Sequence, residues 1–252
     1  MGSRSDERIA MYTRPRHHAV DSALTALDGE FLARAQCFFG GGTRVVLELK
    51  EYRESADIDF LCSDRAGYRI LRSTIKEDSL GAIFARPLAL AREVRADQYG
   101  IRTVLRIGDE LIKFEIVNEA RIDLSGENVP SLHVPSLDRV CFFAEKILAN
   151  DDRWNDESVL SRDIIDLAFM IQAWGVKPFR EGLRKAHLAY GDHIADSIRS
   201  AAMKLRDKKS YQKMRGWLAG NESGYTGGRP EADCCNRLVE GQVIKDGNLC
   251  AE

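Results

Sequence analysis

Two carboxylates separated by a single residue, Asp57 and Asp59, are the groups in this chain best suited to chemistry. Side chains at positions i and i+2 of a strand share a face, so both carboxylates would project into one small volume. Two such groups would raise each other's pKa unless a cation lay between them. Mg²⁺ is the natural occupant, because it is a hard cation that proteins bind through carboxylates together with substrate phosphates.

A run of glycines precedes this pair, in the segment Gly40-Gly41-Gly42-Thr43. Glycine lets the backbone approach a ligand closely, and the amides at the start of a helix attract anions. A phosphate-binding turn beside metal-binding carboxylates supplies the parts needed for phosphoryl or nucleotidyl transfer.

A later segment, residues 111–117, has the alternation of a strand, with Lys113 and Glu115 on the face opposite three apolar side chains. A polar pair in the middle of a strand is as often a solvent-facing surface as a functional site. Further along, Lys146 falls in an amphipathic helix and is followed by Arg162, Asp163 and Asp166. A helical lysine is usually exposed, and Arg162 and Asp166 have the spacing of an intrahelical ion pair.

The order of these segments resembles the AbiEii/AbiGii toxin family within the polymerase-β-type nucleotidyltransferases. The resemblance is carried by Gly-Gly-Thr, by Arg-x-Ser-x-Asp-Ile-Asp-Phe, and by Ala-x-Lys followed by Arg-Asp-x-x-Asp-Leu, and it covers roughly residues 30–175. It implies an α+β fold, with a mixed or antiparallel nucleotidyltransferase sheet flanked by helices and then an α-helical domain. It also implies an enzyme that moves a nucleoside monophosphate from an NTP to an acceptor hydroxyl with one or two Mg²⁺ ions.

The resemblance assigns catalytic roles to three acidic residues and to the pair formed by Lys146 and Asp163. Asp57, Asp59 and Glu115 would bind the metal, and Glu115 would also be placed to accept the proton of the attacking hydroxyl. Lys146 would neutralise triphosphate charge, and Asp163 would position Lys146 or contact the nucleotide.

A further group of residues would hold the phosphates of the NTP. Gly41, Gly42, Thr43 and Ser55 would contact the phosphate oxygens, and Arg53 would add positive charge there. Each side chain also has an ordinary structural explanation: Thr43 as a helix cap, Ser55 as a turn residue and Arg53 as a surface charge.

Resemblance to the AbiEii group also implies a bacterial toxin that acts on tRNA 3′ ends and is inhibited by a cognate antitoxin protein. The basic stretch from Arg199 to Arg215 is compatible with an RNA partner, and equally with an ordinary solvated helix surface. Two alternatives remain: transfer of a nucleotide to a small molecule such as an antibiotic, and a non-catalytic module that binds a nucleotide or a partner. The histidines His17 and His18 are expected to be polar residues at a helix entry rather than metal ligands.

The composition of the 252 residues, 44% hydrophobic and 30% charged, is that of a globular protein. No apolar run approaches the roughly 20 residues that cross a bilayer, and no hydrophobic signal region is evident, so a cytoplasmic location without membrane contact is expected. Of the six cysteines, Cys37, Cys62 and Cys141 lie in apolar segments and are expected to be buried thiols. A role for the tail and its Cys234-Cys235 pair is left open.

The elements that must position these groups follow from hydrophobic periodicity and turn signals. Helices are expected at 17–36, 43–49, 66–78, 137–149, 162–174, 179–190 and 193–217, with Ser136 as the cap of the fourth. Strands are expected at 37–39 and 58–62, then as a meander at 89–96, 101–107 and 111–117, with a loop at 120–135. These elements predict a catalytic domain over 1–125, a helical domain over 126–218 and a weakly packed tail over 219–252, with a small strand at 237–245.

Overall fold

The computed structural model describes residues 12–207 and 212, and the chain divides into two compact units, Met1–Asp138 and Arg139–Glu252. The first unit is built around a β-sheet and the second, in its described part, is helical. The predicted α+β class, with a mixed sheet flanked by helices and a following helical part, is confirmed. The three-domain division stays a prediction.

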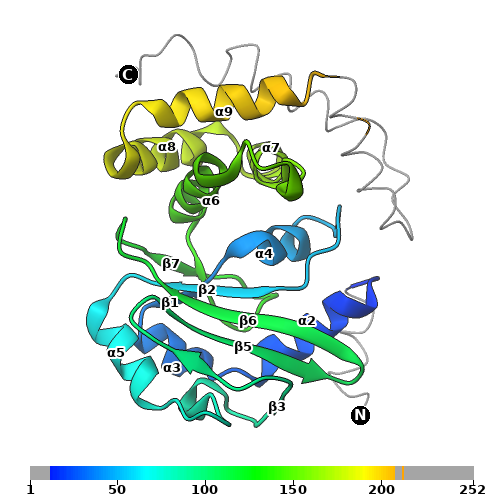
Figure 1. Ribbon diagram of the computed structural model, residues 1–252, viewed down its shortest axis with the longest axis vertical. Coiled ribbons are helices and arrows are strands. Elements are labelled where there is room, and N and C mark those ends of the chain that lie inside the picture. Colours follow the sequence, from blue (N-terminus) through cyan, green and yellow to red (C-terminus); the bar gives the residue numbers. More distant parts are fainter. Residues whose placement is uncertain (1–11, 208–211, 213–252) are drawn as a thin grey trace. The chain divides into compact units, whose positions relative to one another are not determined.

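The sheet of the first unit has eight strands in the order β3-β5-β6-β2-β1-β8-β7, and β4 also pairs with β5 (Figure 1). Two of its pairings, β2 with β6 and β1 with β8, are parallel, and the others are antiparallel. The strands span the following residues: β1 Cys37–Phe39, β2 Ile58–Cys62, β3 Ala89–Leu90, β4 Arg95–Ala96, β5 Gly100–Ile107, β6 Glu110–Asn118, β7 Gly126–Asn128 and β8 Pro135–Leu137.

Helices cover the two faces of this sheet unequally. Three of them, α2, α3 and α5, lie on one face, and α4 lies on the other (Figure 1). Between the sheet and the three helices lies the apolar core, in which the ring of Phe60 packs against Phe39 and Phe114 at centroid distances of 5.4 and 6.1 Å. The helices span α2 Pro15–Ala26, α3 Gly29–Arg34, α4 Gly41–Glu48 and α5 Arg65–Ser73, with a 3₁₀ turn η1 at Gly81–Ile83.

Two helix predictions in the first unit were wrong in extent. The single helix expected over 17–36 is two helices, because Leu27 leaves the helical path to bridge with Phe84, and Asp28 then caps α3 by accepting a hydrogen bond from the Phe31 amide. The helix expected over 66–78 ends at Ser73.

The region after β6 also differs from the prediction. Residues 120–135 were expected to form a loop, but they contain β7 and the start of β8. Ser136 is a buried residue of β8 and not a helix cap, and the following helix begins only at Arg139. The strand expected over 89–96 is two short strands, β3 and β4, that both pair with β5. β7 and β8 extend the sheet beside β1, so the first compact unit runs to Asp138.

The second unit is a group of helices that pack on α6. These are α6 Arg139–Arg153, α7 Arg162–Trp174, α8 Val176–Tyr190 and α9 His193–Lys204, with a 3₁₀ turn η2 at Glu157–Val159. Phe143 anchors the packing, with its ring edge-on to Phe179 and Trp174 at 5.6 and 5.9 Å. A Cβ on Gly182 would collide with the Phe143 side chain, so glycine lets α8 approach α6 closely.

None of the helices within residues 12–207 is long and apolar enough to cross a membrane. Cys37, Cys62 and Cys141 are buried thiols, as expected. The other three cysteines, the tail, the strand expected at 237–245 and the end of the helix expected over 193–217 lie outside the described residues.

Candidate active site

The parallel register of β2 and β6 places Asp59 directly beside Glu115. Phe60 and Phe114, the neighbours of these two residues in sequence, are fully buried in the core. Because successive side chains in a strand point to opposite faces, Asp59 and Glu115 project from the other face of the sheet. Asp57 comes immediately before the first residue of β2 and is exposed. The structure therefore brings two of the three predicted carboxylates together on adjacent strands, with the third at the strand entry.

Two cations engage the carboxylate of Glu115. Lys113 donates to one oxygen at 2.7 Å, and the Nε of Arg102 donates to the other at 2.6 Å. Burial by itself would raise the pKa of Glu115, but the hydrogen bonds and charges of Lys113 and Arg102 outweigh it, so this pKa lies below its ordinary value. Glu115 is therefore an ionised group with both oxygens in use.

The ammonium group of Lys113 interacts electrostatically with all three acidic residues. Partial burial lowers its pKa, but the hydrogen bond to Glu115 and the charges of Glu115, Asp59 and Asp57 raise the pKa overall. The ammonium group therefore supplies in part the positive charge that closely spaced carboxylates require.

The implied Mg²⁺ can be tested against these donors. Asp57 and Asp59 offer the hard carboxylate oxygens that Mg²⁺ prefers, and they fit it in kind. Glu115 differs, because both of its oxygens already bind cationic side chains. Within residues 12–207 and 212, no group of three or more histidine, cysteine or acidic side chains is arranged to hold a metal. Asp57 and Asp59 are thus the fitting ligands, and Glu115 as a third ligand stays a prediction.

The glycine turn lies against Asp59. The amide of Gly40 donates to the Asp59 carbonyl at 2.9 Å, and Gly41 has a φ of +67°. A Cβ on Gly41 would collide with the Asp59 carboxylate, and the left-handed φ disfavours any other residue. Glycine therefore lets the first turn of α4, with its outward-facing amides, begin in contact with a candidate metal ligand.

Four of the predicted phosphate-binding residues gather at the same turn. The Arg53 guanidinium lies where a Cβ on Gly42 would be, and the Ser55 hydroxyl lies near it. The hydroxyls of Thr43 and Ser55 are 3.0 Å apart and hydrogen-bonded. Arg53 is 3% exposed and so is not a surface charge, and Thr43 bonds Ser55 while Gly40 occupies the N-cap position. The structure thus gathers a glycine turn, two hydroxyls and one guanidinium beside Asp59.

His17 is a buried part of this site that sequence reasoning missed. Its Nδ1 lies 2.6 Å from a Glu51 carboxylate oxygen, and its Nε2 accepts the backbone N–H of Ser55 at 3.2 Å. Accepting that bond requires Nε2 to be unprotonated, so the ring is the neutral tautomer with its proton on Nδ1. Burial lowers the pKa of His17 despite Glu51, in agreement with this assignment. The imidazole fixes the loop that leads to Asp57, and no spacing in the sequence signals such a contact.

A buried arginine ties α4 to the end of the sheet. Arg44 donates to the Leu137 carbonyl of β8 and to Glu127 of β7, the latter at 3.0 Å. The short helix that bears two β-branched residues, Val45 and Val46, is therefore held in place by its packing and by Arg44 rather than by intrinsic propensity.

The second charged pair of the prediction lies in the helical unit and is buried. The Lys146 ammonium contacts Asp163 at 3.2 Å and Asp166 at 2.5 Å, and Arg153 makes a two-pronged contact with Asp163 at 2.6 and 2.9 Å. Burial would raise the pKa of Asp163, but Lys146 and Arg153 hold it below its ordinary value. Asp166 thus contacts Lys146, whereas Arg162 donates to a backbone carbonyl, so the intrahelical pair considered above is not formed.

Only part of the predicted basic stretch falls within the described residues. There, Arg199 pairs with Asp196, and Lys204 donates to the Asn155 carbonyl at 3.4 Å. The later basic residues, Lys208, Lys209, Lys213 and Arg215, lie outside the described part. An RNA-binding role for this stretch stays a prediction.

Comparison with known proteins identifies the family of this chain. A family model described as "Nucleotidyl transferase AbiEii toxin, Type IV TA system" matches residues 23–225, which is most of the chain. The chain belongs to this family. The predicted family and the predicted enzyme class, nucleotidyltransferase, are thereby confirmed.

Solved structures share the fold at low sequence identity. A candidate nucleotidyltransferase from H. pylori has a TM-score of 0.50 and 14% identity, and the match covers 89% of this chain and 93% of that one. JHP933 from Helicobacter pylori has a TM-score of 0.50 and 13% identity, with coverage of 91% and 94%. No curated protein matches this AbiEii-family chain in sequence.

Proposed function

We propose that this AbiEii-family enzyme transfers a nucleoside monophosphate from an NTP to a hydroxyl at a tRNA 3′ end, in a Mg²⁺-dependent reaction at the carboxylates of the first unit. In a cell it would act as a toxin restrained by a cognate antitoxin. The observation that carries the proposal is the register of Asp59 with Glu115, together with the glycine turn that lies against Asp59.

The proposed reaction uses the groups of the site for positioning and for charge. The acceptor oxygen attacks the α-phosphorus, the bond from that phosphorus to the bridging oxygen breaks, and pyrophosphate leaves. The amides of Gly41 and Gly42 and the hydroxyls of Thr43 and Ser55 would hold the departing phosphates. Arg53 would offset their charge.

Asp57 and Asp59 would hold the magnesium. When bound there, the ion would neutralise phosphate charge and lower the pKa of the acceptor hydroxyl. Glu115, ionised and fixed by Lys113 and Arg102, would add negative potential beside the acceptor oxygen and favour transfer of its proton to solvent water. The predicted roles of Lys146 and Asp163 at the nucleotide stay predictions.

An Asp59→Asn variant tests the proposal directly. The amide keeps the shape of the side chain but removes its charge, so we expect labelled-nucleotide incorporation to fall by several orders of magnitude, about 10³-fold or more. Asp109→Asn, which changes an exposed turn carboxylate of the same unit, is the matched control and should incorporate at the normal rate. Near-normal incorporation by Asp59→Asn would overturn the proposal.

The acceptor is tested by supplying each labelled NTP with total tRNA, and in parallel with aminoglycosides or lincosamides. Label on tRNA that is removed by trimming of the 3′ end supports the proposal. Label on the small molecules alone would instead assign the alternative of antibiotic modification. Absence of Mg²⁺–NTP binding in calorimetry would favour the non-catalytic alternative.

A further inference from the structure

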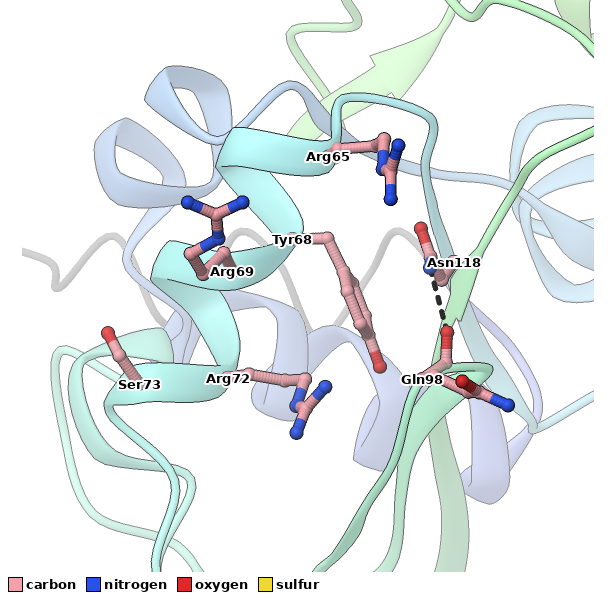
Figure 2. A pocket seen from close by; sticks show the side chains of 7 residues that line it. All are labelled: Arg65, Tyr68, Arg69, Arg72, Ser73, Gln98 and Asn118. Atoms are coloured by element: carbon pink, nitrogen blue, oxygen red, sulfur yellow. Dashed lines mark hydrogen bonds between the residues drawn. The ribbon is translucent and has the colours of Figure 1, made fainter.

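A basic pocket of about 440 Å³ lies beside α5, apart from the carboxylates described above. Its lining includes three arginines of α5 and, with them, Tyr68, Gln98 and Asn118 (Figure 2). Figure 2 shows Arg65 and Arg72 projecting from the helix on the side that carries Tyr68, toward Gln98 and Asn118. Neither the glycine turn nor the carboxylates of Asp57, Asp59 and Glu115 contribute to this lining.

The arginines form a single charged row. Arg65, Arg69 and Arg72 stand at positions i, i+4 and i+7, so they share one face of α5, and all three are exposed. At 1.5 Å of rise per residue the row extends over about 10 Å. Like charges at this spacing repel one another, so the row weakens α5 when it has no counter-charge.

The described part of the chain supplies no ion-pair partner for this row. The nearby carboxylates have other contacts: Asp64 accepts the Gly67 amide as the cap of α5, and Asp97 accepts the amides of Tyr99 and Gly100 and also pairs with Arg102. The guanidinium groups therefore retain their charge and their donors for a ligand.

The walls of the pocket are fixed before any ligand arrives. The buried Tyr68 donates its hydroxyl proton to the Asp97 carbonyl at 2.7 Å, which joins α5 to the turn before β5. Asn118 donates to the Gln98 carbonyl at 2.8 Å, which joins that turn to the end of β6 (Figure 2). Binding a ligand would therefore require little ordering of the backbone.

We propose that this arginine pocket binds the phosphates of a single-stranded segment of RNA. Guanidinium groups match phosphate oxygens with paired donors. A row of about 10 Å is longer than one phosphate group needs, so it fits consecutive phosphates of a strand better than a lone anion. Next to Gln98 in the chain, Tyr99 leaves 66% of its surface exposed, as expected of an aromatic ring on which an unpaired base can stack.

The pocket is placed to anchor the acceptor rather than to react with it. Asn118 comes three residues after Glu115, and its register partner Cys62 comes three residues after Asp59, roughly 10 Å along the strands. Because side chains alternate, Asn118 and Glu115 point to opposite faces of the sheet. The pocket thus lies near the ends of β2 and β6, on the face of the sheet opposite the carboxylates. In calling the bound strand the acceptor, this inference rests on the proposed function.

Binding is measured with fluorescein-labelled single-stranded RNA in the Asp59→Asn background without NTP, so that no transfer occurs. A triple variant, Arg65→Gln with Arg69→Gln and Arg72→Gln, removes the row and keeps much of each side chain's polarity. The matched control removes three exposed arginines of the same unit that do not line the pocket: Arg86→Gln, Arg92→Gln and Arg106→Gln.

We expect the pocket variant to lose about 10-fold or more in affinity and to reduce the slope of log K against log salt by about 2, the value for three phosphate contacts on a single strand. The control should differ from the parent by less than about 3-fold. Equal losses in the two triple variants would overturn the proposal, because they would show a diffuse charge effect. Displacement of the RNA by millimolar inorganic phosphate would also overturn it, since the pocket would then take a lone anion.

Transfer assays with otherwise native protein separate this inference from the proposed function. The same triple variant should raise the KM for RNA about 10-fold and leave kcat within about 2-fold. RNA binding that depends on the pocket, without transfer to any RNA by the native protein, would leave the pocket standing and remove the proposed acceptor. Normal transfer with an unchanged KM in the variant would overturn the role of the pocket in binding RNA and leave the proposed function standing.

Discussion

The molecule contains two clusters in which acidic groups meet a lysine, and they differ in exposure. In the first unit, Lys113 contacts Glu115 at 2.7 Å with half of the lysine side chain exposed. In the second, Lys146 contacts Asp166 at 2.5 Å and also reaches Asp163, with 6% of the lysine side chain exposed. The contacts have similar lengths, but the lysine is open to water only in the first cluster.

This difference separates an exposed cluster from a buried one. Charges that water can reach lose little when they exchange partners, so the first cluster can admit phosphates and a metal. Buried charges depend on one another, because a group that loses its partner keeps the full cost of desolvation. The carboxylates of the first unit are therefore accessible for the proposed chemistry. The Lys146 cluster joins α6 to α7, and the predicted roles of Lys146 and Asp163 at the nucleotide stay predictions.

The largest effect in this comparison is expected from Gly41→Ala. The new Cβ would collide with the Asp59 carboxylate at a φ of +67°, and a displacement of about 1 Å at a catalytic group costs about 10²-fold in rate. Gly108→Ala is the matched control, because Gly108 has a φ of +58° with no atom near its would-be Cβ. It should lose about 1–2 kcal/mol of stability and keep the native rate of nucleotide incorporation. Equal rates in both variants would contradict the contact between the glycine turn and Asp59.

The second-largest expected effect is a difference in unfolding free energy between a Lys146 variant and a Lys113 variant. Lys146→Met leaves Asp163 and Asp166 with one cation fewer in a buried site, and we expect it to cost about 3–5 kcal/mol of unfolding free energy. Lys113→Met breaks an exposed pair and should cost about 1 kcal/mol or less. Urea unfolding followed by circular dichroism measures both.

Lys146→Arg provides the control for charge, since it keeps a cation among the carboxylates. It should recover part of the stability that Lys146→Met loses. If the two methionine variants were equally stable, burial would not distinguish the two clusters.

The smallest expected effect is a pH dependence of the unfolding free energy that arises from His17. Burial lowers the pKa of the folded imidazole from its ordinary value of 6.5, so below that value the unfolded chain binds a proton that the folded chain does not. The contribution of His17 to stability is thus complete above about pH 6.5 and declines as the pH falls through that value. In a His17→Gln variant this part of the decline between pH 7.5 and 5 should be absent.

His18→Gln is the matched neighbour for that measurement and should retain the decline, because His18 lacks the buried contact with the Ser55 amide. The measured quantity is the slope of unfolding free energy against pH. A decline of native size in His17→Gln would assign the effect to other groups.

Local patterns were sufficient to predict several elements of the fold. Strand β2 and helix α7 begin and end at the predicted residues, because alternation in one and helical periodicity in the other are uninterrupted. Predictions failed where a long-range contact overrides the local signal. Leu27 interrupts an otherwise helical run to bridge with Phe84, and Ser136 joins a strand because β1 offers it a parallel edge.

The sequence by itself determined which chemical groups are available: two carboxylates one residue apart, a glycine turn before them, and a family pattern that names the enzyme class. Such features are local in the chain, and local spacing expresses them. Only the tertiary structure decided which of these groups meet. The pairing of Asp59 with Glu115, the burial of Arg53 and Lys146, and the contact of the His17 imidazole with the Ser55 amide all depend on segments distant in sequence. Register, burial and pairing are properties of packed neighbours, and no single segment encodes them.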